Sequence, residues 1–153
     1  MNLKKIFTAG SVTVDLHGGN KQEIIRELML LMVSSGRVRS SDLEGVIDAI
    51  VKRELRMSTG MQDGIAIPHA KSKAVKSLAA VLGIKKNGID FDSIDGKPST
   101  IFIATLSPEE NPIPHVQFLA EISKRLRSAN FRTNLINSNS DEELLANLIE
   151  GSK

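Results

Sequence analysis

The sequence of 153 residues contains no cysteine, no tryptophan and no tyrosine, and it has only five phenylalanines. Without cysteine there is no disulfide, no thiolate metal site and no cysteine nucleophile. So few aromatic side chains, together with the lack of a dense Lys/Arg stripe, argue against nucleic acid as a partner. The longest apolar run, Leu28–Val33, is far shorter than the roughly 20 residues that span a bilayer, so we expect no membrane insertion.

The remaining composition is typical of one globular domain. Hydrophobic residues make up 41% of the chain and charged residues 25%, with a net charge of +2. This length suits a single core, so we expect one domain over residues 1–153 with its core at about 10–150. Only scattered apolar residues follow the two N-terminal lysines, so no secretory signal is indicated and we expect a cytoplasmic protein.

Capping residues and apolar periodicity predict helices towards both ends of the chain. Asn20–Ser34 begins with an asparagine cap and a glutamate three residues later, and Ser41–Leu55 begins with a Ser-x-x-Glu box. Both segments carry apolar residues at helical spacing. Further helices are predicted over 112–128, over 131–136 and from Ser140 onward.

Alternating or β-branched apolar segments predict strands, mostly in the middle of the chain. These segments are Ser11–Leu16, Ile65–Ile67, Leu78–Lys86 and Ser99–Leu106. The leucines and alanines of Leu78–Lys86 also allow a helix. The proline at 68 is expected to end the second of them. Strands interleaved with helices in this way predict an α/β fold with a mixed sheet and helices on both faces.

His69 is the first candidate for chemistry, because polar and flexible residues precede it. Ser58 and Thr59 offer hydroxyl and N–H groups, and Gly60 and Gly64 allow a tight turn that could hold an anion beside the imidazole. The alternative is a histidine at a strand end whose ring nitrogens bond the backbone. Spacing alone leaves both interpretations open.

Two further side chains could assist such an anion site. His115 lies in the first turn of a predicted helix, where the free N–H groups favour a neutral imidazole that could hydrogen-bond a phosphoryl oxygen. Arg53, near the end of the second predicted helix, could clamp a phosphoryl group through its fork of donors. The alternatives are a surface histidine and a solvated cation. His17 is expected to be a solvated loop histidine, and Glu54 and Arg56 to belong to a solvated helix face.

Motifs for metals, nucleotides and serine nucleophiles are incomplete. The aspartates of Ile89–Gly96 are spaced like a calcium loop, but its twelfth position is Ile101 in place of the required glutamate. A zinc site would need a third ligand besides His69 and His115. No P-loop and no Gly-x-Ser-x-Gly elbow is present. We therefore expect neither a metal nor another cofactor.

The segment Arg53–Ala70, RELRMSTGMQDGIAIPHA, resembles the phosphorylation-site signature of the EIIA domains of the fructose/mannitol family in the bacterial phosphoenolpyruvate-dependent phosphotransferase system. The nitrogen-regulatory relatives of these domains share the signature. An Arg-Glu pair, a Ser-Thr-Gly turn and Gly-Ile-Ala-Ile-Pro-His all stand at the family's spacing. The likeness continues through Gly88–Pro98, His115–Leu126 and SDEELLANL, although Val116 replaces the usual leucine and the preceding NPIP is rich in proline.

This resemblance implies a three-layer α/β/α sandwich on a mixed sheet, and it implies roles for three side chains. His69 would accept a phosphoryl group from the histidine phosphocarrier HPr and, in transport members, pass it to an EIIB domain. Arg53 and His115 match the residues that support the phosphohistidine. Because phosphoryl transfer depends mainly on positioning and charge stabilisation, such groups suffice without a metal.

Three functions remain open from the sequence. The chain could be a sugar-transport component that feeds an EIIB, a nitrogen-regulatory protein whose partners sense phosphorylation, or a binding module that keeps the fold without being phosphorylated. The free-standing length and the tail SDEELLANLIE favour the regulatory type. The joint presence of Arg53, Gly64, Pro68, His69 and His115 argues against the unphosphorylated module.

Overall fold

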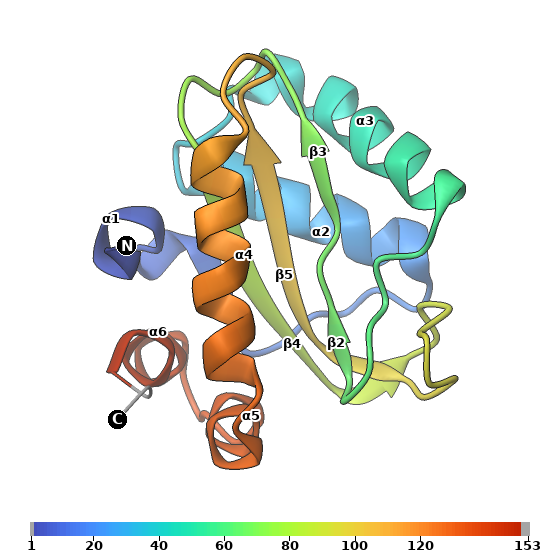
Figure 1. Cartoon of the computed structure of the whole chain (residues 1–153), viewed down its shortest axis with the longest axis vertical. Helices are drawn as coiled ribbons and strands as arrows, with labels where there is room; N and C mark the ends of the chain where they lie inside the picture. Colours follow the sequence, from blue (N-terminus) through green and yellow to red (C-terminus); the bar gives the residue numbers. More distant parts are fainter. Residues whose placement is uncertain (1, 151–153) are drawn as a thin grey trace.

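A five-stranded mixed sheet forms the middle layer of the computed structural model, which describes residues 2–150 (Figure 1). The strands are β1 (Val12–Thr13), β2 (Ile65–Ala66), β3 (His69–Lys71), β4 (Ala79–Ile89) and β5 (Ser99–Ser107). Their order is β1-β4-β5-β2, and β3 pairs with β5 beyond the end of β2. Only β4 and β5 are antiparallel, whereas the other pairs are parallel. The predicted mixed sheet is confirmed.

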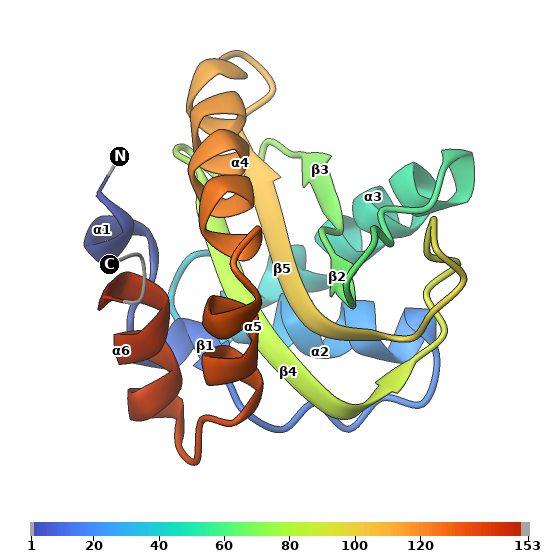
Figure 2. The ribbon, with the colours of Figure 1, turned by 60° about the horizontal axis from the view of Figure 1, so that its bottom comes forward.

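Helices cover both faces of this sheet (Figures 1 and 2). On one face lie α2 (Lys21–Ser34) and α3 (Leu43–Arg56). The other face is covered by α1 (Leu3–Ile6), α4 (Ile113–Leu126), α5 (Ala129–Ile136) and α6 (Asp141–Glu150). Each face has its own apolar core, so the predicted three-layer α/β/α sandwich is confirmed.

Side-chain alternation along β5 separates the two cores. Ile101 and Ile103 pack with the α4 side, whereas Phe102, Ala104 and Leu106 pack with the α2 and α3 side. The same alternation places Thr105 on the α4 side, in a strand that is otherwise apolar here.

Most of the predicted elements are present with shifted ends. Asn20 caps α2 by accepting a hydrogen bond from the Glu23 N–H, and Ser140 accepts from the Glu143 N–H before α6, as predicted. The prediction of a capping box at Ser41 was wrong, because a 3₁₀ turn at Ser40–Asp42 precedes α3. The carboxylate of Glu44 instead binds the Arg26 guanidinium at 2.7 and 3.1 Å.

The strand predictions err mainly at the ends. Only Val12–Thr13 of the expected Ser11–Leu16 strand joins the ladder. The chain does resume strand pairing after Pro68, since β3 begins at His69, and the Pro68 carbonyl accepts from the Thr105 N–H at 3.0 Å. Pro68 therefore interrupts the edge of the sheet without ending it.

The folded part begins earlier than the expected residue 10. Leu3 and Phe7 are 2% and 1% exposed, and both belong to the core on the α4 side. The helices of residues 2–150 include none with the length and apolar character that crossing a membrane requires.

Candidate functional site

Three predicted site residues come from separate elements that meet at one edge of the sheet. His69 is the first residue of β3, Arg53 lies in the last turn of α3, and His115 lies in the first turn of α4. Because β3 runs parallel to β5, and α4 follows β5 directly, the carboxyl end of β5 brings His115 to the strand that carries His69.

One hydrogen bond fixes the ring of His69. Its Nδ1 lies 2.8 Å from the carbonyl oxygen of Ile67. Since a carbonyl only accepts, Nδ1 carries a proton, and in the neutral ring it is Nε2 that has the lone pair. No hydrogen-bond partner of Nε2 occurs among residues 2–150, and no buried side-chain nitrogen in that range lacks a partner. Nε2 is therefore open to solvent, in the form that a nucleophile requires.

His115 is held beside His69 through Thr105. The register of β3 and β5 pairs His69 with Thr105, and the fully buried Thr105 places its Oγ1 2.9 Å from His115 Nε2. The two imidazole rings are 5.2 Å apart at their centroids. The strand register and this hydrogen bond together place the two histidine side chains next to each other.

The half-buried ring of His115 is neutral. Burial, together with smaller contributions from the nearby His69 and Lys71, lowers the pKa of His115 from 6.5 to about 4. At neutral pH His115 therefore has one N–H and one lone pair. Thr105 occupies Nε2, so Nδ1 is the nitrogen left for another partner.

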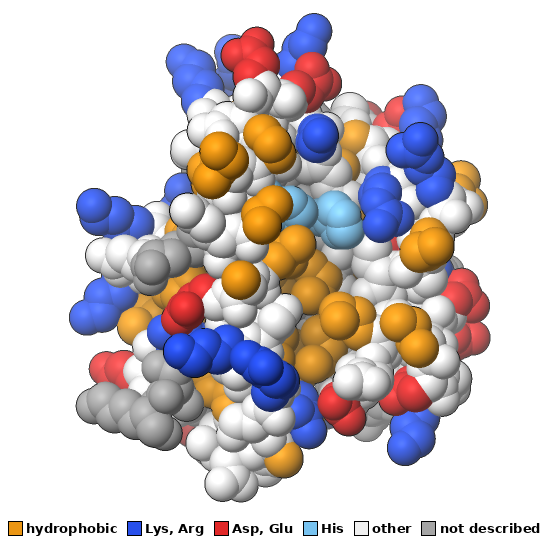
Figure 3. All heavy atoms as spheres, viewed as in Figure 1, with side chains coloured by type: hydrophobic (Ala, Val, Ile, Leu, Met, Phe, Trp, Pro, Cys, Tyr) orange, Lys and Arg blue, Asp and Glu red, His pale blue; other side chains and the backbone are white. Residues whose placement is uncertain are grey.

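Arg53 shares a groove with His69. Its Nη1 donates to the Met57 carbonyl at 2.8 Å, beyond the end of α3. The groove of about 730 Å³ between α3 and β3 is lined by both side chains. Figure 3 shows Lys and Arg side chains on one side of the histidines.

The turn from Ser58 to Gly64 uses most of its polar groups internally. Ser58 Oγ donates to the Phe91 carbonyl at 2.5 Å and accepts from the Gly60 N–H at 3.0 Å. Thr59 donates both its N–H and its hydroxyl to Glu54. These groups are engaged, so the turn acts first as a support for the strand that carries His69, and its contact with phosphate stays a prediction.

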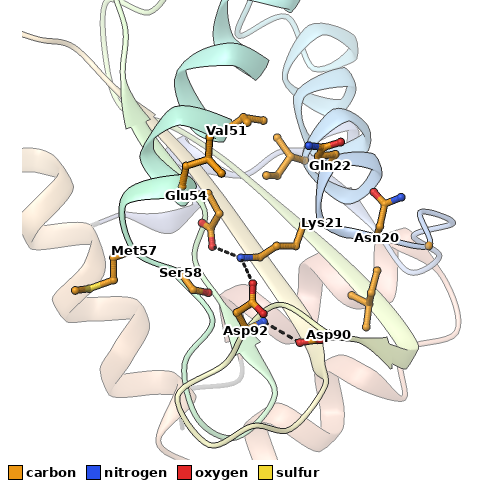
Figure 4. Close-up of a pocket in the computed structure, with 13 residues that line it drawn as sticks. Asn20, Lys21, Gln22, Val51, Glu54, Met57, Ser58, Asp90 and Asp92 are labelled. Carbon is orange, nitrogen blue, oxygen red and sulfur yellow. Dashed lines mark hydrogen bonds and ion pairs between the residues drawn. The ribbon is translucent and has the colours of Figure 1, made fainter.

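Glu54 corrects the sequence interpretation, because it is 8% exposed and not part of a solvated face. Its Oε1 and Oε2 accept from the N–H and Oγ1 of Thr59 at 2.8 and 2.7 Å. Lys21 Nζ lies 3.2 Å from Glu54 Oε1 and 3.0 Å from Asp92 Oδ2. Figure 4 shows the Lys21 side chain lying between these two carboxylates. These contacts satisfy a carboxylate that would otherwise be costly to bury.

Through Thr59, a chain of hydrogen bonds links Glu54 to His69. The Thr59 carbonyl accepts from the Ile67 N–H at 3.1 Å, and the Ile67 carbonyl accepts from His69 Nδ1 at 2.8 Å. The sequence carried a signal for this role, since Glu54 follows Val46 and Ile50 at a spacing of four residues, and these three are the buried positions of α3.

The remaining histidine, His17, is not part of this site. The side chain of His17 is 79% exposed and lies 3.5 Å from Asp15, as expected for a loop histidine. Within residues 2–150, no group of three or more His, Asp or Glu side chains is arranged to hold a metal ion.

The family follows from a comparison with known proteins. The family described as "Phosphoenolpyruvate-dependent sugar phosphotransferase system, EIIA 2" matches residues 5–151. The chain belongs to this EIIA family. The resemblance inferred from Arg53–Ala70 is thus confirmed over nearly the whole chain.

Relatives of this EIIA chain have both transport and regulatory names. It is 34% identical over 133 residues to a fructose-specific EIIA component of Haloferax volcanii, covering 85% of each chain. It is 30% identical over 145 residues to a nitrogen regulatory protein of Pseudomonas aeruginosa, covering 94% of this chain and 92% of the relative. It spans only 22% of the fructose-specific EIIABC component of Bacillus subtilis, at 28% identity and over 95% of its own length.

Solved EIIA structures share the fold. Nitrogen regulatory protein IIA-Ntr from Neisseria meningitidis superposes with a TM-score of 0.84 at 26% identity, covering 95% of this chain and 98% of that one. Enzyme IIAMTL from Escherichia coli, in its complex with phosphorylated enzyme IIBMTL, gives a TM-score of 0.77 at 20% identity, covering 93% and 96%.

Proposed function

We propose that this EIIA protein is a phosphocarrier and that Nε2 of His69 accepts the phosphoryl group. One observation carries the proposal: the Ile67 carbonyl holds the proton on Nδ1 and leaves Nε2 unpaired and open to solvent. In the transfer, a bond forms between Nε2 and phosphorus as the bond between phosphorus and a donor histidine breaks. The donor ring leaves as neutral imidazole, and the His69 ring gains positive charge.

The Ile67 carbonyl then does more than orient the ring. As positive charge develops on the imidazole, the hydrogen bond from Nδ1 to this carbonyl strengthens, because the donor becomes charged. An interaction that is stronger in the transition state than in the ground state speeds the reaction. When the phosphoryl group leaves, the ring returns to the neutral form with its proton still on Nδ1, so the same carbonyl restores the tautomer that can accept the next phosphoryl group.

The neighbouring groups have supporting roles in this proposal. Arg53, which lines the groove with His69, stabilises the phosphoryl oxygens through its guanidinium. The neutral His115 donates a hydrogen bond from Nδ1 to a phosphoryl oxygen, while its Nε2 accepts a hydrogen bond from the Thr105 hydroxyl. In this proposal the turn of Ser58, Thr59, Gly60 and Gly64 supports the strand that carries His69 and contributes to holding the phosphoryl group.

The proposed relay runs between cytoplasmic proteins. An HPr-type histidine carrier is the donor, and the complex of enzyme IIAMTL with phosphorylated enzyme IIBMTL supports an EIIB protein as acceptor. The TM-score of 0.84 with IIA-Ntr and the similarity to a nitrogen regulatory protein support a regulatory use of the same phosphohistidine. The fructose-specific EIIA relative keeps sugar transport as the alternative.

A transfer assay tests this function. The purified chain is incubated with phosphoenolpyruvate, enzyme I and HPr, and the phosphate bound to it is measured before and after acid treatment. We expect acid-labile phosphate on the wild type and none on His69→Ala, with His17→Ala as the matched control that labels normally. If His69→Ala labels as well as the wild type, the assignment of the acceptor is wrong.

The same preparation separates the downstream uses. Phosphorylated chain is offered to candidate EIIB proteins, and loss of phosphate from the chain is followed. Rapid transfer to an EIIB identifies a transport component, whereas phosphate retained on the chain supports the regulatory use. A chain that no HPr phosphorylates, yet that binds a protein partner regardless of His69→Ala, is the unphosphorylated module.

A further inference from the structure

The groove beside His69 is lined by cations and by no acidic side chain. Its residues are Ala49, Lys52, Arg53, Arg56, His69, Ala70 and Lys71. Three of the cations come from consecutive turns of α3, and Lys71 comes from β3 two residues after His69. Four positive charges therefore border a single histidine.

Most of this charge is uncompensated. Lys52 Nζ lies 2.9 Å from Asp48 on the same helix. Within residues 2–150, ion pairs of Arg53, Arg56 and Lys71 do not occur, and the one bond of Arg53 goes to the Met57 carbonyl. The charge of Lys71 also contributes to the lowered pKa of His115, so the field of the groove reaches the pair of histidines.

The opposite border of the histidines is apolar. Ile113 and Val116 flank His115 in the first turn of α4, and each is 63% exposed. In Figure 3 hydrophobic side chains lie on one side of the pale blue histidines, and Lys and Arg side chains lie on the other. We call Ile113, Val116 and the four cations of the groove the docking face.

We propose that the docking face binds a phosphocarrier protein whose own surface is acidic where it covers the groove and apolar where it covers the start of α4. This inference rests on the proposed function, because a donor must bring its phosphohistidine against His69 and therefore covers both borders at once. Opposite charges across such an interface steer the encounter and fix its orientation. The exposed Ile113 and Val116 supply the apolar part that the centre of an interface requires.

The test compares two forms of one HPr-type carrier, with either acidic residues or lysines at surface positions flanking its phosphorylated histidine. Phosphoryl transfer to the wild type is expected to be faster from the acidic form by about tenfold at low salt, and the difference shrinks as salt is raised. The variant Lys52→Glu/Arg56→Glu is expected to reverse this preference. Lys52 and Arg56 take no part in the proposed reaction at His69.

The matched control is Lys4→Glu/Lys5→Glu, which changes the net charge equally on exposed residues of α1, away from the groove. This control is expected to keep the wild-type preference. Phosphoramidate, which phosphorylates histidine without docking, is the second readout, and it should label wild type and both variants at equal rates.

The outcomes are distinguishable. Failure of phosphoramidate and of both carriers to label wild-type His69 overturns the proposed function. Normal labelling with no preference for the acidic carrier, or an unchanged preference in Lys52→Glu/Arg56→Glu, overturns the acidic partner alone. If Lys52→Glu/Arg56→Glu is labelled by phosphoramidate as slowly as by the acidic carrier, relative to the wild type, the substitutions act on the chemistry at His69. This result also overturns the docking proposal.

Discussion

The two nitrogens of His69 have different tasks, and this resolves the two interpretations that spacing alone left open. Nδ1 is satisfied by the backbone, as in a structural strand-end histidine, through its bond to the Ile67 carbonyl at 2.8 Å. Nε2 is left for another partner. The backbone bond is therefore compatible with chemistry at the same ring, because it selects the tautomer that can act as a nucleophile.

The His115 side chain makes the stability of the fold depend on pH. Its pKa falls from 6.5 to about 4 on folding, so between these values the unfolded chain binds a proton that the folded chain rejects. The contribution of His115 is fully present above pH 6.5 and is lost as the pH falls towards 4. As the pH is lowered from about 7 to about 5, the free energy of unfolding of His115→Gln is expected to fall less than that of the wild type. Urea titration at each pH measures both values.

The control for this experiment is His17→Gln, which alters an exposed histidine and should keep the wild-type dependence on pH. Equal pH dependence in His115→Gln and the wild type would show that the His115 imidazole is not kept neutral by the fold.

Among the elements, α3 serves both the core and the site. Val46, Ile50 and Glu54 form one buried stripe, and the last of them supports the turn that precedes His69. Apolar periodicity predicts the helix correctly, but a carboxylate on its buried face is interpreted as solvated unless its place in the stripe is noticed. The partners that satisfy Glu54, namely Thr59 and Lys21, come from a turn and from α2, and local sequence cannot reveal them.

We expect Glu54→Gln to weaken the support beneath His69. The amide group replaces one acceptor oxygen with a donor, so either Thr59 or Lys21 loses its partner, which costs about 1–3 kcal/mol in a buried site. Urea unfolding gives the loss of stability, and transfer from phosphorylated HPr gives a lowered rate. In contrast, Glu44→Gln changes an exposed side chain of α3, so it should lose less stability and leave the transfer rate unchanged. Equal effects in both variants would contradict a positioning role for Glu54.

The turn before β2 depends on one glycine. Gly64 has a φ of +75°, and a Cβ there would lie 2.8 Å from Thr100 Oγ1. Gly64→Ala should therefore cost about 1–3 kcal/mol in thermal or urea unfolding. The matched variant Gly45→Ala, in α3 with nothing within 4 Å, should gain about 0.5–1 kcal/mol. A loss in both variants, or in neither, would contradict this account of the turn.

For the whole molecule, local patterns predict the layers but not the contacts between distant segments. The helices at Asn20 and Ser140 and the strand from Ser99 are predicted because caps and β-branched runs are local signals. The short α1 lacks enough residues for a periodic signal, and the 3₁₀ turn before α3 replaces a capping box that its sequence also allows. The pair of histidines depends on the register of β3 against β5, which no local pattern encodes.

The acceptor atom offers the most direct test of the central claim. The chain, labelled with ¹⁵N at histidine, is phosphorylated by HPr, and the imidazole nitrogens are assigned by NMR with detection of coupling to ³¹P. The geometry predicts that His69 carries its proton on Nδ1 before transfer and phosphorus on Nε2 afterwards. Phosphorus on Nδ1 of His69, or on His17 or His115 with His69 unmodified, would contradict the account.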